Sequence, residues 1–163
     1  MYLSELRPDI SQGDIFVEVP FPYFANTENL NDPKPSYLIC TVMLISHSCD
    51  YDKPNSKFCL VAQIRPISEL NPNSHGNLRK EGLINTIYLP RVTGKIDESY
   101  VDLRNITSIQ KIILSNQAAN GKRILSVTDD YLRGVMGVDP ALGLWNRLSY
   151  FFGPRKDDLD KPE

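Results

Sequence analysis

The chain has 163 residues, of which 41% are hydrophobic and 23% are charged, and its formal net charge is −2. This length gives room for one domain with a proper core and excludes two comfortable ones. The near-neutral charge excludes a global basic field, so binding of nucleic acid would need a local patch.

Cysteine usage and the N-terminus indicate the compartment. The three cysteines, Cys40, Cys49 and Cys59, are an odd number with no paired spacing, and Cys40 lies in an apolar stretch, which favours reduced thiols in the cytosol. Residues 1–10 lack the pattern of a signal peptide, and no apolar run reaches the roughly 20 residues of a membrane helix. We expect a cytoplasmic protein without membrane association, and no cofactor is indicated.

The first third of the chain predicts two strands around a polar loop. Residues 15–19 read as a strand that the prolines of the segment 20–24 should end, before a loop over 25–36. The aromatic side chains of that segment, Tyr23 among them, either form a lid on one end of the fold or offer a surface on which a base or partner stacks. Residues 37–46 are almost entirely apolar or β-branched and predict a strand buried on both faces.

The middle of the chain predicts further short strands. Residues 58–64 return as a strand, so that 37–46 and 58–64 form a hairpin with residues 47–57 in its loop. A short helical turn near 69–70 and a polar loop over 71–80 follow. Strands are then expected at 83–89, 99–103 and 106–109.

The last third changes to a helical pattern. Residues 126–129 supply N-cap candidates for a helix carrying Tyr131, Leu132 and Val135, and Asp139-Pro140 opens a second helix with Trp145 on its packed face. We expect one domain over 1–153 and a disordered charged tail over 154–163. The fold class is mainly β with C-terminal helices, arranged as a small, partly open barrel.

Several segments in the same order resemble the MazF/PemK-like toxins. They are Gly13-Asp14-Ile15, the residues 42–46 (VMLIS), 59–68 (CLVAQIRPIS), 101–106 (VDLRNI) and 148–153. The resemblance implies an SH3-like barrel that acts on RNA, as a metal-independent endoribonuclease of a toxin–antitoxin or defence module. It also implies an antitoxin-like protein partner, and we expect a homodimer formed through the open barrel face.

The resemblance carries over only one of two ribonuclease positions. Ser68 matches the Ser/Thr with which the third strand of those toxins ends. Their arginine before the second strand has no counterpart, because Cys40 and Thr41 precede Val42.

A dense group of reactive side chains follows the second strand and is where we expect any chemistry. The group is Ser46, His47, Ser48, Cys49, Asp50 and Asp52. In one interpretation RNA is cleaved by its own 2′-OH. His47 then acts as general acid or base, because imidazole suits proton transfer near neutral pH, Arg65 or Lys53 supplies positive charge, and Ser68 donates a hydrogen bond. This interpretation requires His47, Asp50, Arg65 and Ser68 to meet on one concave surface.

Two other interpretations stay open. Cys49 could be a thiolate nucleophile with His47 as its base, although Asp50 and Asp52 would raise the thiol pKa; a metal site of His47, Cys49 and Asp50 with Cys59 or His75 fits no standard zinc spacing. Alternatively nothing is catalysed, Ser48 and Asp50 cap the turn, and the barrel binds a nucleotide, nucleic acid or protein. The binding residues expected are Ser46, Ser48, Asp52, Lys53 and Tyr23.

Overall fold

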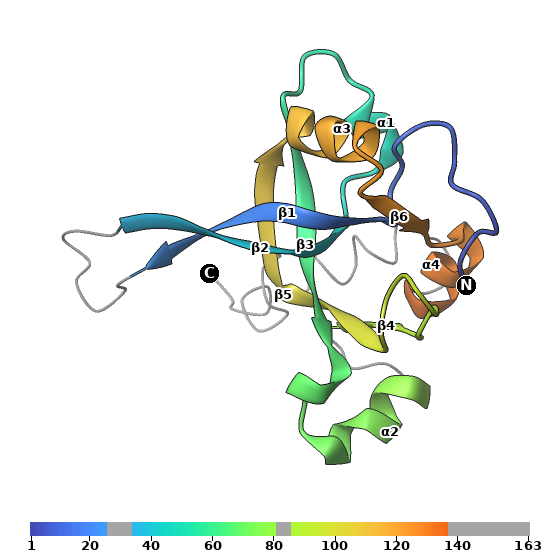
Figure 1. Ribbon diagram of the computed structural model, residues 1–163. Helices are drawn as coiled ribbons and strands as arrows, with labels where there is room; N and C mark the ends of the chain where they lie inside the picture. Colours follow the sequence, from blue (N-terminus) through green and yellow to red (C-terminus); the bar gives the residue numbers. More distant parts are fainter. Residues whose placement is uncertain (26–33, 81–85, 137–163) are drawn as a thin grey trace, which may run out of the picture.

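The computed structural model describes residues 1–25, 34–80 and 86–136. Six strands of this part form one antiparallel sheet in the order β4-β5-β3-β2-β1-β6 (Figure 1). They are β1 (Asp14–Ala25), β2 (Lys34–Leu44), β3 (Phe58–Pro66), β4 (Thr86–Leu89), β5 (Ser99–Gln110) and β6 (Arg123–Ser126). The helices are α1 (Ser48–Tyr51), the 3-10 turn η1 (Ile67–Glu69), α2 (Pro72–Lys80), α3 (Lys111–Ala119) and α4 (Asp129–Met136). The prediction of a mainly β chain is confirmed.

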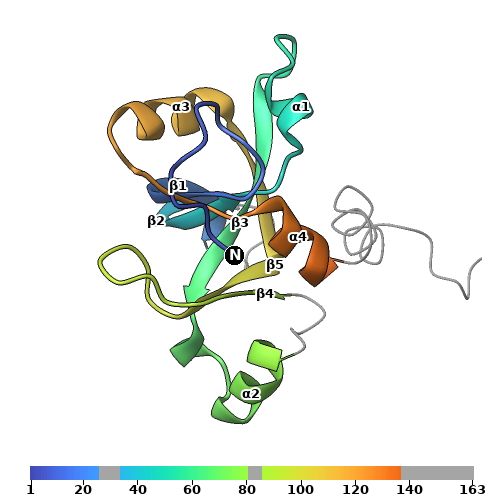
Figure 2. The same ribbon diagram turned by 90° about the vertical axis from the view of Figure 1, so that its right-hand side faces the viewer.

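The sheet is curled but open, because no ladder joins its edge strands β4 and β6 within the described residues. Side chains of both edges nevertheless share one core, in which Leu89 of β4 and Leu125 of β6 belong to the same cluster. The helix α4 and the N-terminus lie between the edges (Figure 2). There the hydroxyl of Tyr131 donates to the Tyr88 carbonyl at 2.6 Å, and the hydroxyl of Tyr2 donates to the Pro90 carbonyl at 2.9 Å.

Two hydrophobic clusters lie on opposite faces of the central strands. Ile15 and Met43 belong to the cluster inside the curve of the sheet, whereas their neighbours Phe16 and Leu44 belong to a second cluster that includes Leu114 of α3. Successive side chains of a strand point to opposite faces, so both faces of the inner part of β2 are buried. No described helix is long and apolar enough to span a membrane.

The expected burial of the whole segment 37–46 is wrong for its first residues. Tyr37, Leu38 and Ile39 are 66%, 47% and 60% exposed. The reason is that β3 pairs with β2 only from Thr41 to Leu44, so the outer part of β2 extends beyond the body of the sheet.

The prolines of β1 do not end pairing, contrary to the prediction. The ladder with β2 continues to the pair Ala25–Lys34 and gives a two-stranded projection, the arm (Pro20–Ala25 with Lys34–Ile39; Figure 1). Proline is tolerated there because its missing N–H can face solvent on an edge strand. Of the aromatic segment expected to form either a lid or a stacking surface, Phe21 is buried in the second cluster, whereas Tyr23 is 41% exposed on the arm.

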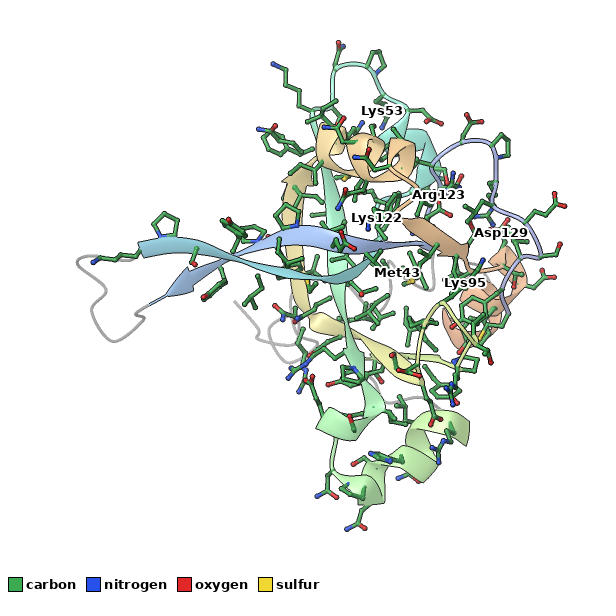
Figure 3. All side chains as sticks on the ribbon, in the orientation of Figure 1. Met43, Lys53, Lys95, Lys122, Arg123 and Asp129 are labelled. Atoms are coloured by element: carbon green, nitrogen blue, oxygen red, sulfur yellow. The ribbon has the colours of Figure 1, made fainter. Side chains whose placement is uncertain are left out.

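A bulge in β1 separates the arm from the body of the sheet. The register with β2 shifts between Phe16 and Val19, and Glu18 has a positive φ of 58°. The amide of Gln117 in α3 donates to the Val17 carbonyl at 3.3 Å. The ammonium of Lys122, which is labelled in Figure 3, donates to the Glu18 carboxylate at 2.6 Å. Bulges bend and twist the strand that carries them, which accounts for the change of direction before the arm.

Several predicted elements have different bounds. The segment 71–80, expected to be a loop, contains α2, whose Asn71 accepts a capping hydrogen bond from the Asn73 amide at 3.0 Å. The two strands expected at 99–103 and 106–109 are one strand, β5, with a register shift between them. The helix predicted to carry Tyr131 and Leu132 is confirmed as α4, and Thr128 Oγ1 accepts from the Tyr131 amide at 3.2 Å. The second helix and the tail lie outside the described residues.

A buried ion pair connects β1 to β6. The guanidinium of Arg123 lies 2.7 Å from the Asp14 carboxylate, and these side chains are 7% and 0% exposed. Ser126 Oγ donates to Asp14 at 2.6 Å, and the Ser11 amide donates to it at 2.7 Å. Burial raises the pKa of Asp14, while these contacts act in the opposite direction.

We expect Arg123→Met to lower the free energy of unfolding by about 3–5 kcal/mol, because it leaves the Asp14 carboxylate buried without its cation. The double variant Asp14→Asn/Arg123→Met should lose less than the sum of the two single variants. Urea denaturation measures both. Arg91→Met is the control, since Arg91 lies 3.4 Å from Asp97 and both are exposed, so its loss should cost less than about 1 kcal/mol. Equal losses at Arg123 and Arg91 would contradict this role.

Candidate functional site

Hydrogen bonds from Gln12, in the turn before β1, hold the start of the loop between β2 and β3. The side-chain amide of Gln12 donates to the Ile45 carbonyl at 2.6 Å, and the Gln12 backbone amide donates to Ser48 Oγ at 3.2 Å. Ser46 Oγ accepts from the Leu60 amide at 2.7 Å, which joins the end of β2 to β3. The start of the reactive segment is therefore held by both of its neighbours.

The other side of the loop is fixed by α3. The hydroxyl of Tyr51 shares a hydrogen bond with Ser115 Oγ at 3.2 Å and donates to the Lys111 carbonyl at 3.3 Å. The ammonium of Lys111 donates to the carbonyls of Tyr51 and Lys53, and it lies 5.3 Å from the centre of the Tyr51 ring. Burial raises the pKa of Tyr51, so this hydroxyl stays protonated at neutral pH. The loop is a built structure rather than a loose connection.

A pocket of about 410 Å³ lies beside this loop. Its lining combines hydroxyls, one ammonium, a thiol and two apolar side chains: Ser46, Lys53, Ser56, Phe58, Cys59, Leu60 and Ser108. Phe58 and Leu60 are 55% and 41% exposed, so an aromatic ring and an aliphatic side chain present their surfaces to solvent. The pocket can therefore hold a ligand with both a flat apolar part and a polar or anionic part.

The predicted binding residues lie partly at this pocket. Ser46 and Lys53 line it, and His47, which follows Ser46 directly, has an exposed side chain. Ser48 is engaged by Gln12, and Asp52 is exposed at the end of the same loop. Cys49 and Asp50 belong to α1, but their side chains lie outside the described part of the structure.

Arg65 and Ser68 lie at the opposite end of β3. Arg65 is five residues beyond Leu60, which is about 16 Å along a strand. Its guanidinium lies 2.6 Å from the Glu69 carboxylate and 3.6 Å from that of Asp102. Ser68 follows in η1, next to α2 and far from α1 and α3 (Figure 1). The structure does not bring Arg65 and Ser68 together with His47, and Tyr23 lies elsewhere again, on the arm.

The thiols of the described part are poor nucleophiles. Burial raises the pKa of Cys40 and of Cys59 to about 11. Cys59 also donates weakly to the Ile109 carbonyl, at 3.8 Å. Among the side chains that the structure describes, which do not include those of Cys49 and Asp50, no group of three or more His, Cys, Asp or Glu could hold a metal ion. His75, named as a metal candidate, lies in α2 with its ring nitrogen 3.2 Å from the Leu70 carbonyl.

Sequence reasoning missed the apolar half of the pocket. Phe58 and Leu60 belong to the apolar run of the predicted strand 58–64, and nothing in that run shows that their face of the strand is exposed while Cys59 between them is buried on the other face. Ser108 lines the pocket because β5 pairs with β3, which places Ser108 opposite Leu60. Ser56 lies in the predicted loop over 47–57, but nothing in the sequence assigned it a role.

Comparison with known proteins gives no family for this chain. No protein-family model matches it, and no curated protein is significantly similar to it.

We expect Cys40 and Cys59 to resist alkylation by iodoacetamide at pH 7, because both thiols remain protonated until the pH approaches about 11. Peptide mapping by mass spectrometry should show slow labelling that accelerates as the pH rises. The chain unfolded in urea is the control and should label quickly. Rapid labelling of folded Cys59 at pH 7 would contradict the described burial.

Proposed function

We propose that this chain binds single-stranded nucleic acid, and RNA in the first place, in the pocket between the loop 46–56 and β3. The observation that supports the proposal is one lining that joins the exposed ring of Phe58 to the ammonium of Lys53 and three serine hydroxyls. Bases stack on exposed aromatic rings, phosphates pair with lysine, and hydroxyls bond to sugar and base edges.

The proposal concerns a local site rather than a charged surface. The net charge of −2 provides no long-range attraction for a polyanion. Lys53 and the neighbouring exposed Lys57 supply the positive charge next to Phe58. We therefore infer contact with a few nucleotides and modest affinity, with a correspondingly small dependence on salt.

We expect Phe58→Ala to weaken binding of a short fluorescent oligoribonucleotide by about 1–3 kcal/mol, because a stacked base loses its platform. Lys53→Glu should weaken binding further at low salt and reduce the slope of log affinity against log salt by about 0.7 for each lost phosphate contact. Fluorescence anisotropy measures both quantities.

Matched surface changes serve as controls for this experiment. Leu6 is exposed to 42% and lies outside the pocket, so Leu6→Ala should leave the affinity unchanged. Arg91→Glu makes an equivalent charge reversal at an exposed residue away from the pocket. If the controls weaken binding as much as Phe58→Ala and Lys53→Glu, the pocket is not the binding site.

A second candidate is RNA cleavage at the same site. It is favoured by His47, whose exposed imidazole follows a pocket-lining residue and belongs to a residue type suited to proton transfer. The resemblance to MazF/PemK-like toxins, with their SH3-like barrel and antitoxin partners, is its other support. Because Arg65 and Ser68 lie at the far end of β3, cleavage here would depend on His47 and Lys53.

We expect a cleaving enzyme to lose turnover in His47→Ala while keeping its affinity for the oligoribonucleotide, because only proton transfer is removed. Gel analysis of a labelled substrate in the presence of a chelator measures the cleavage. His75→Ala is the matched histidine control, at the α2 end of the molecule. Intact RNA after prolonged incubation with the wild-type chain would leave binding alone as the function.

A further inference from the structure

The arm exposes apolar side chains on both of its faces. Tyr37 and Ile39 lie on one face, together with Pro20 and Pro22, and Tyr23 and Leu38 lie on the other. Four of the eight large hydrophobic residues exposed in the described part of the chain belong to this projection: Tyr23, Tyr37, Leu38 and Ile39. A two-stranded ribbon is only marginally stable by itself in water, so a surface of this kind favours a partner.

The two edges of the arm differ in their hydrogen-bonding groups. Pro22 lies opposite Tyr37, and Pro20 lies opposite Ile39. Two directly opposed residues of an antiparallel ladder either exchange hydrogen bonds or direct their backbone N–H and C=O groups away from each other. A pair that contains proline is of the second kind, because proline has no N–H to donate. In these two pairs the backbone N–H and C=O groups therefore point to the outer edges of the arm. The β1 edge of the arm lacks the N–H groups of Pro20 and Pro22. The β2 edge lacks only that of Pro35, near its outer end, and presents the N–H and C=O groups of Tyr37 and Ile39.

The body of the sheet leaves this edge of β2 uncovered. Within residues 1–25, 34–80 and 86–136, β3 pairs with β2 only over Thr41–Leu44, and β6 pairs with β1 only over Asp14–Phe16. Figure 1 shows the arm leaving the sheet at a steep angle to β3. Another strand can therefore approach the outer part of β2.

We propose that the arm pairs with the arm of a second copy of this chain, β2 against β2, about a two-fold axis at Leu38. In this register Tyr37 of each copy lies opposite Ile39 of the other, and the two pairs exchange main-chain hydrogen bonds. Tyr37 and Ile39 form aromatic–β-branched cross-strand pairs on one face, and the two Leu38 side chains meet on the other. The inference is independent of the proposed RNA site.

Charge and closure favour a second copy of the chain. Apart from Lys34 at its outer end, the described strands of the arm carry no charged residue, so pairing desolvates no ion. Antiparallel pairing places the two copies of Lys34 at opposite ends of the joined arms. The resulting four-stranded ribbon has the prolines of β1 at both outer edges, which blocks further strand addition and closes the assembly as a dimer.

The first test is the mass of the full chain by analytical ultracentrifugation over a range of concentrations. The wild-type chain should be a dimer. Tyr37→Pro should raise the dissociation constant by about tenfold or more, since each copy loses one outward N–H and one aromatic side chain. Its circular dichroism and thermal unfolding show whether the body remains folded. Tyr23→Lys, on the proline-blocked strand, is the matched control and should remain a dimer.

The second test is cross-linking, which depends on register rather than on stability. In the proposed register the two copies of Leu38 form a non-hydrogen-bonded pair. The Cα atoms of such a pair lie about 4.5 Å apart, which is within the range of a disulfide. Leu38→Cys should give a cross-linked dimer on mild oxidation, whereas Tyr23→Cys should not exceed the wild-type background. A wild-type monomer at every concentration, a dimer unchanged by Tyr37→Pro, growth beyond the dimer, or no Leu38→Cys cross-link would overturn the proposal.

Discussion

The turn at Gln12, Gly13 and Asp14 is the constraint on which the rest of the structure depends. Gly13 has a φ of +85°, its amide donates to the Leu44 carbonyl at 2.9 Å, and its carbonyl accepts from the Val127 amide at 3.1 Å. A Cβ at this position would lie 2.9 Å from Leu132 Cδ1 of α4. Glycine is therefore favoured by the left-handed conformation, and a Cβ would also force the Leu132 side chain to move. One turn connects the inner end of β2, the residue after β6, and α4.

The same turn supports the two surfaces that we propose to be functional. On one side Gln12 holds the loop that begins at Ser46, and beside that loop lies the pocket with Phe58 and Lys53. On the other side β1 leaves the turn, bends at the bulge before Val19, and continues as the arm. The pocket lies beyond the inner end of β2, and the arm contains its outer end. Mutations can therefore test the two surfaces separately.

The sequence predicted the elements whose signals are local. The hairpin of β2 and β3 follows from two apolar runs around turn residues, and α4 follows from the cap at Thr128. The features that the sequence did not predict depend on how strands pair and helices pack in the folded chain. The arm continues past Pro20 because that residue lies on an edge, which only the pairing reveals. The helix α3 was not predicted, and within its apolar run Leu114 is buried whereas Ile112 is 56% exposed, a difference that only the packing of the helix reveals. The separation of Ser68 from His47 likewise follows from the length of β3.

The most direct test of the central claim is a titration of the isotopically labelled chain with a short oligoribonucleotide, followed by NMR. If the pocket binds RNA, the backbone amide signals of the segment 53–60 and of Ser108 should shift in proportion to occupancy. Signals of Arg65, Ser68 and α2, at the opposite end of β3, should stay unchanged. Shifts confined to that end or to the arm, or no shifts at all, would contradict the proposed site.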